Sequence, residues 1–218
     1  MKILVTRGGW DGHEPFQTTD IFINWLKEQG YEVIVSDTLD AYNDLDNLKT
    51  FDLLIPMWTM GTIAGEQEKN LLEAIKNGLN VAGWHGGMCD AFRANTNYQF
   101  MTGGQWVSHP GGIIDYSVEI TKPEDPIVKG IKPFMMKSEQ YYMHVDPSNE
   151  VLATTTFKGD QEGMDWIKGT VMPVAWKRYY GKARIFYTSL GHVASDFSVP
   201  EALEIMKRGI KWAMFGSV

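Results

Sequence analysis

The sequence predicts one α/β domain over residues 1–218, built on a parallel sheet with helices on both faces. In the first half, short apolar strands alternate with helical segments, which is typical of parallel sheets. Gly-rich loops follow the ends of these strands, where ligands bind in open sheets of this class. Beyond about Phe100, strand-like segments follow one another with few helices between them. We therefore expect extra antiparallel or mixed strands in the C-terminal half.

The elements of the N-terminal half are indicated by apolar runs and helical spacing. Phe22, Trp25 and Leu26 fall on one helical face, and Gly30 ends that helix. A second helix, residues 66–77, has acids in its first turn and a glycine just past its end, as the helix dipole and C-cap rules favour. The predicted strands are 2–6, 31–36, 51–56 and 80–83, with a polar connection at 37–47 and a loop at 57–65.

The C-terminal half contains predicted strands and one long final helix. That helix, residues 200–214, carries Leu203, Met206, Ile210 and Ala213 on one face and should pack on the sheet. The predicted strands are 113–121, 134–144, 151–157, 171–177 and 183–189.

Composition limits the classes of function. An apolar content of 44% indicates a soluble globular protein, and no run of about 18 apolar residues predicts a membrane span. The net charge of −7 argues against nucleic acid as a partner. The single cysteine, Cys89, excludes an internal disulfide and a cysteine-rich zinc site. The first residues read as a strand rather than a signal peptide, so we expect a cytoplasmic protein. The sequence leaves open whether the chain forms a homo-oligomer.

A sharp strand-to-helix turn is predicted after the fourth strand. The chain reads Gly83-Trp84-His85-Gly86-Gly87, with glycines on both sides of the apex. Such glycines allow unusual dihedral angles and close approach of neighbouring backbone. Hydrolases with this type of turn carry a nucleophile at its apex, whereas here the apex residue is a histidine.

The chain has only five histidines, and four of them lie in or next to Gly-rich turns. His13, His85 and His192 are expected to share one pocket at the carboxyl ends of the strands, and His109 is a further candidate. His144 lies within a predicted strand and could face the core or solvent. The alternative is that each turn histidine only hydrogen-bonds to local backbone.

A histidine cluster supports two kinds of chemistry. Together with a carboxylate such as Glu14, Asp115 or Glu139, imidazoles can hold a divalent metal such as zinc. Alternatively, histidine acts as a general acid or base near neutral pH. The spacing does not choose between these chemistries, because the chain has no His-Glu-x-x-His motif. The metal candidates are His13, His85 and His109.

Several short motifs together resemble the trehalose-utilisation (ThuA-like) family over nearly the whole chain. They are the loop ending in His13-Glu14, the Gly-Trp-His85-Gly-Gly turn, Gly103-Gly104-Gln-Trp106-Val-Ser-His109-Pro, Glu139-Gln-Tyr141-Tyr142 and Ser-Leu-Gly-His192. The resemblance implies a flavodoxin-like fold, similar to that of class I glutamine amidotransferases. It also implies that the nucleophilic cysteine of those enzymes is missing, so no functional glutamine amidotransferase is expected.

The resemblance implies a sugar-processing protein of trehalose or disaccharide utilisation, acting on trehalose-type or 3-keto sugars. We expect His85, His192 and Glu139 to carry acid–base catalysis. The alternative is a non-catalytic carbohydrate-binding protein on the same scaffold, and a third, weaker reading is amide hydrolysis by Cys89. Since aromatic faces stack on sugar rings, the expected substrate-binding residues are His13, Trp84, His109, Trp106 and Tyr141, although core packing is the alternative for each aromatic.

Overall fold

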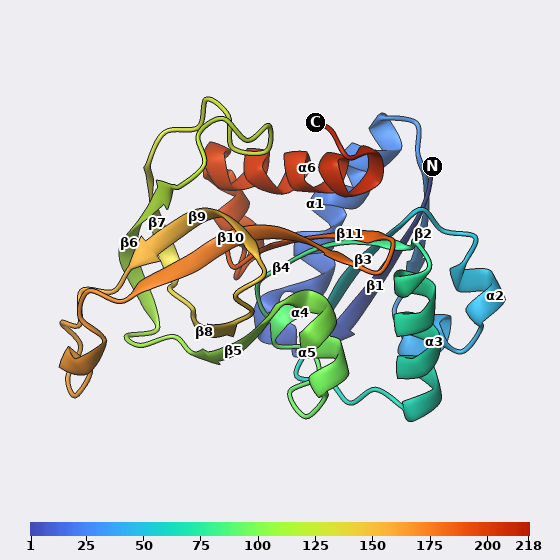
Figure 1. Cartoon of the computed structure of the whole chain (residues 1–218), viewed down its shortest axis with the longest axis horizontal. Coiled ribbons are helices and arrows are strands. Elements are labelled where there is room, and N and C mark those ends of the chain that lie inside the picture. The colour runs from blue at the N-terminus through green and yellow to red at the C-terminus, as the bar shows by residue number, and fades with distance from the viewer.

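The computed structural model describes residues 1–218 and contains a nine-stranded sheet between two layers of helices (Figure 1). The strand order is β2-β1-β3-β4-β11-β10-β9-β6-β7, and β5 pairs with β8 in a separate two-stranded sheet. The strands are β1 (Lys2–Gly9), β2 (Glu32–Ser36), β3 (Leu53–Thr59), β4 (Asn80–Trp84), β5 (Gly104–Ser108), β6 (Ile113–Ile120), β7 (Phe134–Glu139), β8 (Tyr142–Val145), β9 (Glu150–Thr156), β10 (Val171–Tyr180) and β11 (Ala183–Thr188).

The large sheet has a parallel half and an antiparallel half. β2, β1, β3, β4 and β11 run parallel to one another. From β11 outward, β10, β9, β6 and β7 each pair antiparallel with the strand before them. This arrangement confirms the predicted fold class, including the extra strands in the C-terminal half.

Two hydrophobic cores lie on opposite faces of the sheet. Alternate residues of β1 show this, because Ile3 and Val5 join one core and Leu4 joins the other. Helices α1 and α6 supply the first core, and α3, α4 and α5 supply the second (Figure 1). None of the helices has the length and apolar character that a membrane crossing requires. The helices are α1 (Pro15–Glu28), α2 (Leu45–Leu48), α3 (Gly65–Lys76), α4 (His85–Cys89), α5 (Thr96–Thr102) and α6 (Pro200–Phe215), with short 3-10 helices at Asp11–His13, Leu39–Tyr42, Asp165–Ile167 and Ala194–Ser198.

One predicted strand is wrong in a way that matters for the site. The segment 134–144 is not continuous, because β7 ends at Glu139 and β8 begins at Tyr142 in the smaller sheet. Between them, the buried Gln140 side chain donates a hydrogen bond to Thr155 Oγ1 at 2.7 Å, which satisfies its amide away from any strand ladder. The break frees the residues at the end of β7 to face the carboxyl ends of the parallel strands.

Candidate functional site

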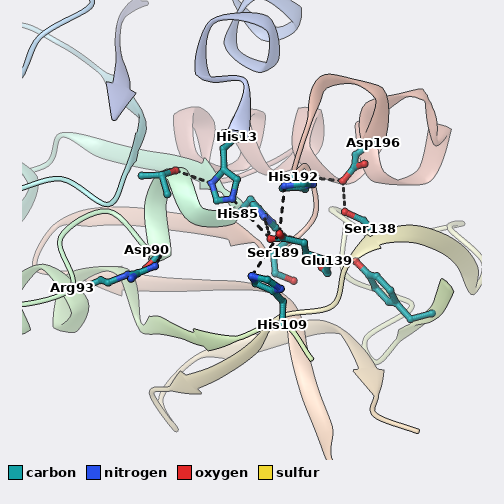
Figure 2. Close-up of polar contacts among 12 residues, drawn as sticks. His13, His85, Asp90, Arg93, His109, Ser138, Glu139, Ser189, His192 and Asp196 are labelled. Atoms are coloured by element: carbon teal, nitrogen blue, oxygen red, sulfur yellow. Dashed lines mark hydrogen bonds and ion pairs between the residues drawn. The ribbon is translucent and has the colours of Figure 1, made fainter. Parts of the chain in front are cut away.

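The carboxyl ends of four neighbouring parallel strands supply the centre of the site (Figure 2). His13 follows β1, Thr59 ends β3, His85 follows β4 and His192 follows β11. Glu139, the last residue of β7, approaches from the antiparallel half. The structure thus brings together the three histidines that the sequence places at strand ends, as open parallel sheets favour.

The carboxylate of Glu139 is the point on which four imidazoles converge. His85 Nε2 lies 3.1 Å from Glu139 Oε2, and His13 Nε2 lies 3.9 Å from the same oxygen. The other oxygen, Oε1, lies 3.5 Å from His192 Nε2 and 3.6 Å from His109 Nε2. His13, His85 and Glu139 are buried, so these interactions are formed away from bulk water.

Hydrogen bonds orient the buried rings. His85 Nδ1 lies 2.7 Å from the carbonyl oxygen of Ser189, which can only accept, so Nδ1 is the donor. His13 Nδ1 shares a 2.8 Å hydrogen bond with Thr59 Oγ1. Both rings therefore direct Nε2 toward the carboxylate. The loop of His192 is held differently, because its backbone N–H donates to Asp196 Oδ2 at 2.9 Å.

The backbone around the site is strained at three positions. The only non-glycine residues with positive φ are Glu14, Met60 and His85, at 46°, 53° and 47°. Glu14 adjoins His13, Met60 follows Thr59, and His85 is the apex of the predicted turn. Left-handed conformations of such residues are costly and concentrate at functional sites. The sharp turn expected from the glycines flanking His85 is present.

The surroundings set the protonation of the cluster. Burial, reinforced by the charges of His85 and His192, lowers the pKa of His13 to about 3, so this imidazole is neutral at physiological pH. Burial also lowers the pKa of His192, with His85 adding to the effect. For Glu139, burial works to raise the pKa, but the hydrogen bond from His85 and the nearby imidazoles outweigh it and lower the pKa to about 2. The site therefore holds the Glu139 carboxylate beside a neutral His13.

A pocket of about 130 Å³ opens onto this cluster. Its wall contains a fork-shaped ion pair in which Arg93 Nε and Nη2 donate to the two oxygens of the buried Asp90, at 2.6 and 2.7 Å. The Arg93 guanidinium also lies over the Trp106 ring, 4.5 Å from its centroid. The buried Trp106 Nε1 and His109 Nδ1 have no hydrogen-bond partner within the chain. The lining residues are Trp10, His13, Met60, Asp90, Arg93, Trp106, His109, Glu139 and Tyr141.

Two sequence expectations need correction. Trp84 was expected to bind substrate, but it is fully buried in the core against Phe22 and Phe197. The reason is strand alternation, since Trp84 shares a face of β4 with Ala82 in the first core, whereas Val81 faces the second core. His109 contacts Glu139 but is not one of the four residues with mutually close ligand atoms, so the expected metal trio of His13, His85 and His109 is not what the structure assembles.

Other candidates lie outside the cluster. His144 is exposed on β8, opposite Gln105. Cys89 is buried in the second core, and burial raises the pKa of its thiol far above the physiological range. A buried, protonated thiol is a poor nucleophile, which disfavours amide hydrolysis by Cys89.

Sequence reasoning missed the residues that support the histidines and the pocket. Thr59 and Ser189 act through single hydrogen bonds to His13 and His85. Thr59 lies in no quoted motif, and Ser189, the first residue of Ser-Leu-Gly-His192, acts through its backbone carbonyl, which any residue type would supply. Asp90 is also missed, because it and Arg93 lie in the turn between α4 and α5, where no helical spacing signals their ion pair.

The four ligand atoms of His13, His85, His192 and Glu139 lie within 4.8 Å of one another. Three imidazoles and one carboxylate suit a divalent metal such as zinc, and the same groups can also exchange protons with a bound substrate. The arrangement is therefore capable of metal binding or of acid–base catalysis.

Comparison with known proteins identifies relatives in sequence and structure. A sequence model for ThuA, described as trehalose utilisation, matches residues 2–213. A ThuA-like protein from Bacteroides uniformis ATCC 8492 has a TM-score of 0.81 at 16% identity, covering 100% of this chain and 94% of that one. A ThuA-like protein from Parabacteroides merdae ATCC 43184 has a TM-score of 0.75 at 18% identity, covering 100% and 91%.

A cytoplasmic protein from Salmonella typhimurium LT2 is similar over 98% of this chain and 97% of its own, with a TM-score of 0.65 and 11% identity. At these identities the structural similarity shows the fold alone. None of the curated proteins matches the chain by sequence.

Proposed function

Because the chain belongs to the trehalose-utilisation (ThuA) family, we propose that it is an enzyme acting on a trehalose-type sugar or its 3-keto derivative. The observation that carries this proposal is the convergence of His85, His192 and Glu139 in one cluster, of which Glu139 also lines a pocket with aromatic walls. Perturbed titratable groups in a pocket are characteristic of catalytic sites. Following the description of the Salmonella relative, we also propose that the protein acts in the cytoplasm.

The pocket supports a sugar as the ligand. Trp106 and Tyr141 offer ring faces for the C–H surface of a pyranose, and the Asp90–Arg93 pair offers charged groups for hydroxyls. A volume of about 130 Å³ is well below the roughly 300–1,000 Å³ of pockets that enclose drug-sized ligands. One ring of a disaccharide would therefore enter, and the second would rest at the mouth beside the half-exposed Trp10.

The cluster supports proton transfer at the enclosed ring. A neutral His192 can accept a proton from the carbon next to a keto group, and the Glu139 carboxylate stabilises the imidazolium that results. His85 lies on the other oxygen of the same carboxylate, and when its Nε2 is protonated it can give that proton to the carbonyl oxygen or to a glycosidic oxygen. Acid–base catalysis by positioned side chains contributes roughly 10²–10⁴-fold to a rate.

The test is turnover of trehalose and 3-keto-trehalose by the wild-type protein and by His85→Ala and His192→Ala. We expect turnover of at least one sugar and a loss of about 100-fold or more in kcat for each variant. Equal rates in wild type and variants would remove both histidines from the mechanism. Calorimetry showing sugar binding without turnover would instead favour the non-catalytic carbohydrate-binding function.

A further inference from the structure

We infer that His13, His85, His192 and Glu139 form a binding site for one divalent transition-metal ion of the zinc class. The four side chains come from four separate segments of the chain, yet their ligand atoms lie within 4.8 Å of one another. Three imidazole nitrogens and one carboxylate oxygen form a ligand set that zinc and its neighbours in the series prefer. The inference goes beyond the proposed sugar chemistry and does not depend on it.

The direction of the ring nitrogens is the strongest support. His85 donates its Nδ1 hydrogen to the Ser189 carbonyl, so Nε2, which faces Glu139, is the nitrogen left to hold either a proton or a metal ion. Nδ1 of His13 is likewise engaged by Thr59 Oγ1, and its Nε2 also faces Glu139. Acceptors that point at other acceptors repel one another unless a proton or a cation lies between them. Hydrogen-bonding one imidazole nitrogen to a protein oxygen is how metal-ligating histidines are usually held.

The distances fit a site that closes slightly on loading. Zinc–nitrogen bonds of about 2.0–2.1 Å place tetrahedral ligand atoms roughly 3.4 Å apart. The separations of Glu139 oxygens from His85, His192 and His13 are 3.1, 3.5 and 3.9 Å. These distances involve both carboxylate oxygens, and the whole set extends to 4.8 Å, so the ligand atoms must draw together when an ion binds. The cluster is also firmly supported, since Tyr141 stacks on His85 with ring centroids 4.0 Å apart.

The position of the site gives the ion access to a ligand. His13 and Glu139 line the 130 Å³ pocket as well as the cluster, so the ion would lie at the pocket floor. His109 stands beside Glu139 but outside the four-atom set, and its buried Nδ1 has no partner within the chain. If the ion stays bound during turnover, His85, His192 and Glu139 are its ligands rather than proton carriers, while the pocket is unchanged.

The experiment is zinc binding to the full-length, tag-free protein after removal of metal with a chelator. Calorimetry with zinc sulfate should show one ion per chain with a dissociation constant below about 1 µM. Cobalt should give the visible absorption of a four- or five-coordinate site, a readout that does not depend on any enzymatic activity. No binding at 100-fold excess zinc would overturn the inference.

Variants locate the site. We expect His85→Ala and His192→Ala to weaken zinc binding by at least about 100-fold. This loss of affinity is larger than the one usually caused by changing a residue that only hydrogen-bonds to a metal ligand. His109→Ala should weaken it less, and His144→Ala, on the exposed face of β8, should leave it unchanged. Because His85→Ala can disturb folding, Thr59→Val is a milder variant, with an expected loss of about 10-fold.

Unchanged zinc affinity in both His85→Ala and His192→Ala would contradict the inference. Sugar turnover is measured separately in chelator. Sugar turnover without metal would support acid–base catalysis that needs no ion. Zinc binding without sugar turnover would support the metal site and contradict the proposed sugar chemistry.

Discussion

The ring of Tyr141 stacks on the imidazole of His85, with centroids 4.0 Å apart and planes inclined by 30°. His85 is held on its other sides by the Ser189 carbonyl and the Glu139 carboxylate. The stack exists because the chain leaves β7 after Glu139 and enters β8 at Tyr142. The interruption between these two strands therefore fixes the orientation of a central residue of the site.

Changing Tyr141 tests this contact. Tyr141→Phe keeps the stacked ring, so kcat on the sugar substrate should stay within about threefold of wild type. Tyr141→Leu removes the planar ring while keeping apolar volume, and we expect kcat to fall by about tenfold or more because the His85 ring loses its support. Steady-state kinetics on both variants provides the comparison. Equal kcat values for the Phe and Leu variants would show that the stack does not position His85.

Gly86 is predicted to be intolerant of any side chain. A Cβ atom there would lie 2.4 Å from His13 Cε1 and 2.6 Å from His13 Nδ1, and the hydrogen bond to Thr59 holds that ring in place. Gly86→Ala should lower the free energy of unfolding by about 1–3 kcal/mol. Urea denaturation followed by tryptophan fluorescence measures the change.

Gly65→Ala is the matched control for that substitution. Gly65 begins α3, and an added Cβ there would meet nothing within 4 Å. Alanine is the better helix former, so stability should be unchanged or should rise by up to about 1 kcal/mol. A loss at Gly65 as large as that at Gly86 would mean that the clash with His13 is not the cause.

Acid should destabilise the metal-free protein through His13. The folded-state pKa is about 3, below the unfolded value of about 6.5, so protons bind preferentially to the unfolded chain. The stabilisation that the neutral His13 gives to the folded state is complete above a pH of about 6.5 and is lost as the pH falls toward 3. Between pH 8 and pH 5 the wild type should lose about 2 kcal/mol more than His13→Asn, which retains a group able to reach Thr59. Urea titrations at the two pH values, in chelator, measure the difference. Equal losses of stability in wild type and His13→Asn would show that His13 is not the group responsible.

Cys89 should be unreactive in the native protein. Its side chain is buried, and burial raises the pKa of the thiol, so almost no thiolate forms at pH 8. Iodoacetamide at pH 8 should leave the intact mass unchanged in buffer and add one adduct in 6 M guanidinium chloride. Rapid labelling of Cys89 in the native protein, accompanied by loss of activity, would support a catalytic role for its thiol.

Much of the fold and part of the site follow from local sequence patterns. Helical spacing and apolar runs predict the parallel half, and the glycines around His85 predict its strained turn, where φ is 47°. Position after a strand end predicts that His13, His85 and His192 meet, because parallel strands bring their carboxyl ends to one edge.

The rest depends on contacts between distant segments. Residues 134–144 are predicted as one strand, and this hides the break after Glu139. The break is stabilised by a hydrogen bond from Gln140 to Thr155, 15 residues away on β9. Trp84 shows the opposite error, since its motif suggests a binding role while the register of β4 turns it into the core. The support of His85 by Ser189 spans 104 positions in the chain, and no local rule anticipates it.

The cluster joins side chains from both halves of the sheet, and this has a consequence for local unfolding. His13 and His85 come from the parallel half, whereas Glu139 arrives at the far edge of the appended strands. Anything bound among these side chains ties the edge strand β7 to the parallel half of the sheet and opposes detachment of β6 and β7. Occupancy should therefore slow amide hydrogen exchange along those outer strands, beyond the residues that touch the bound group.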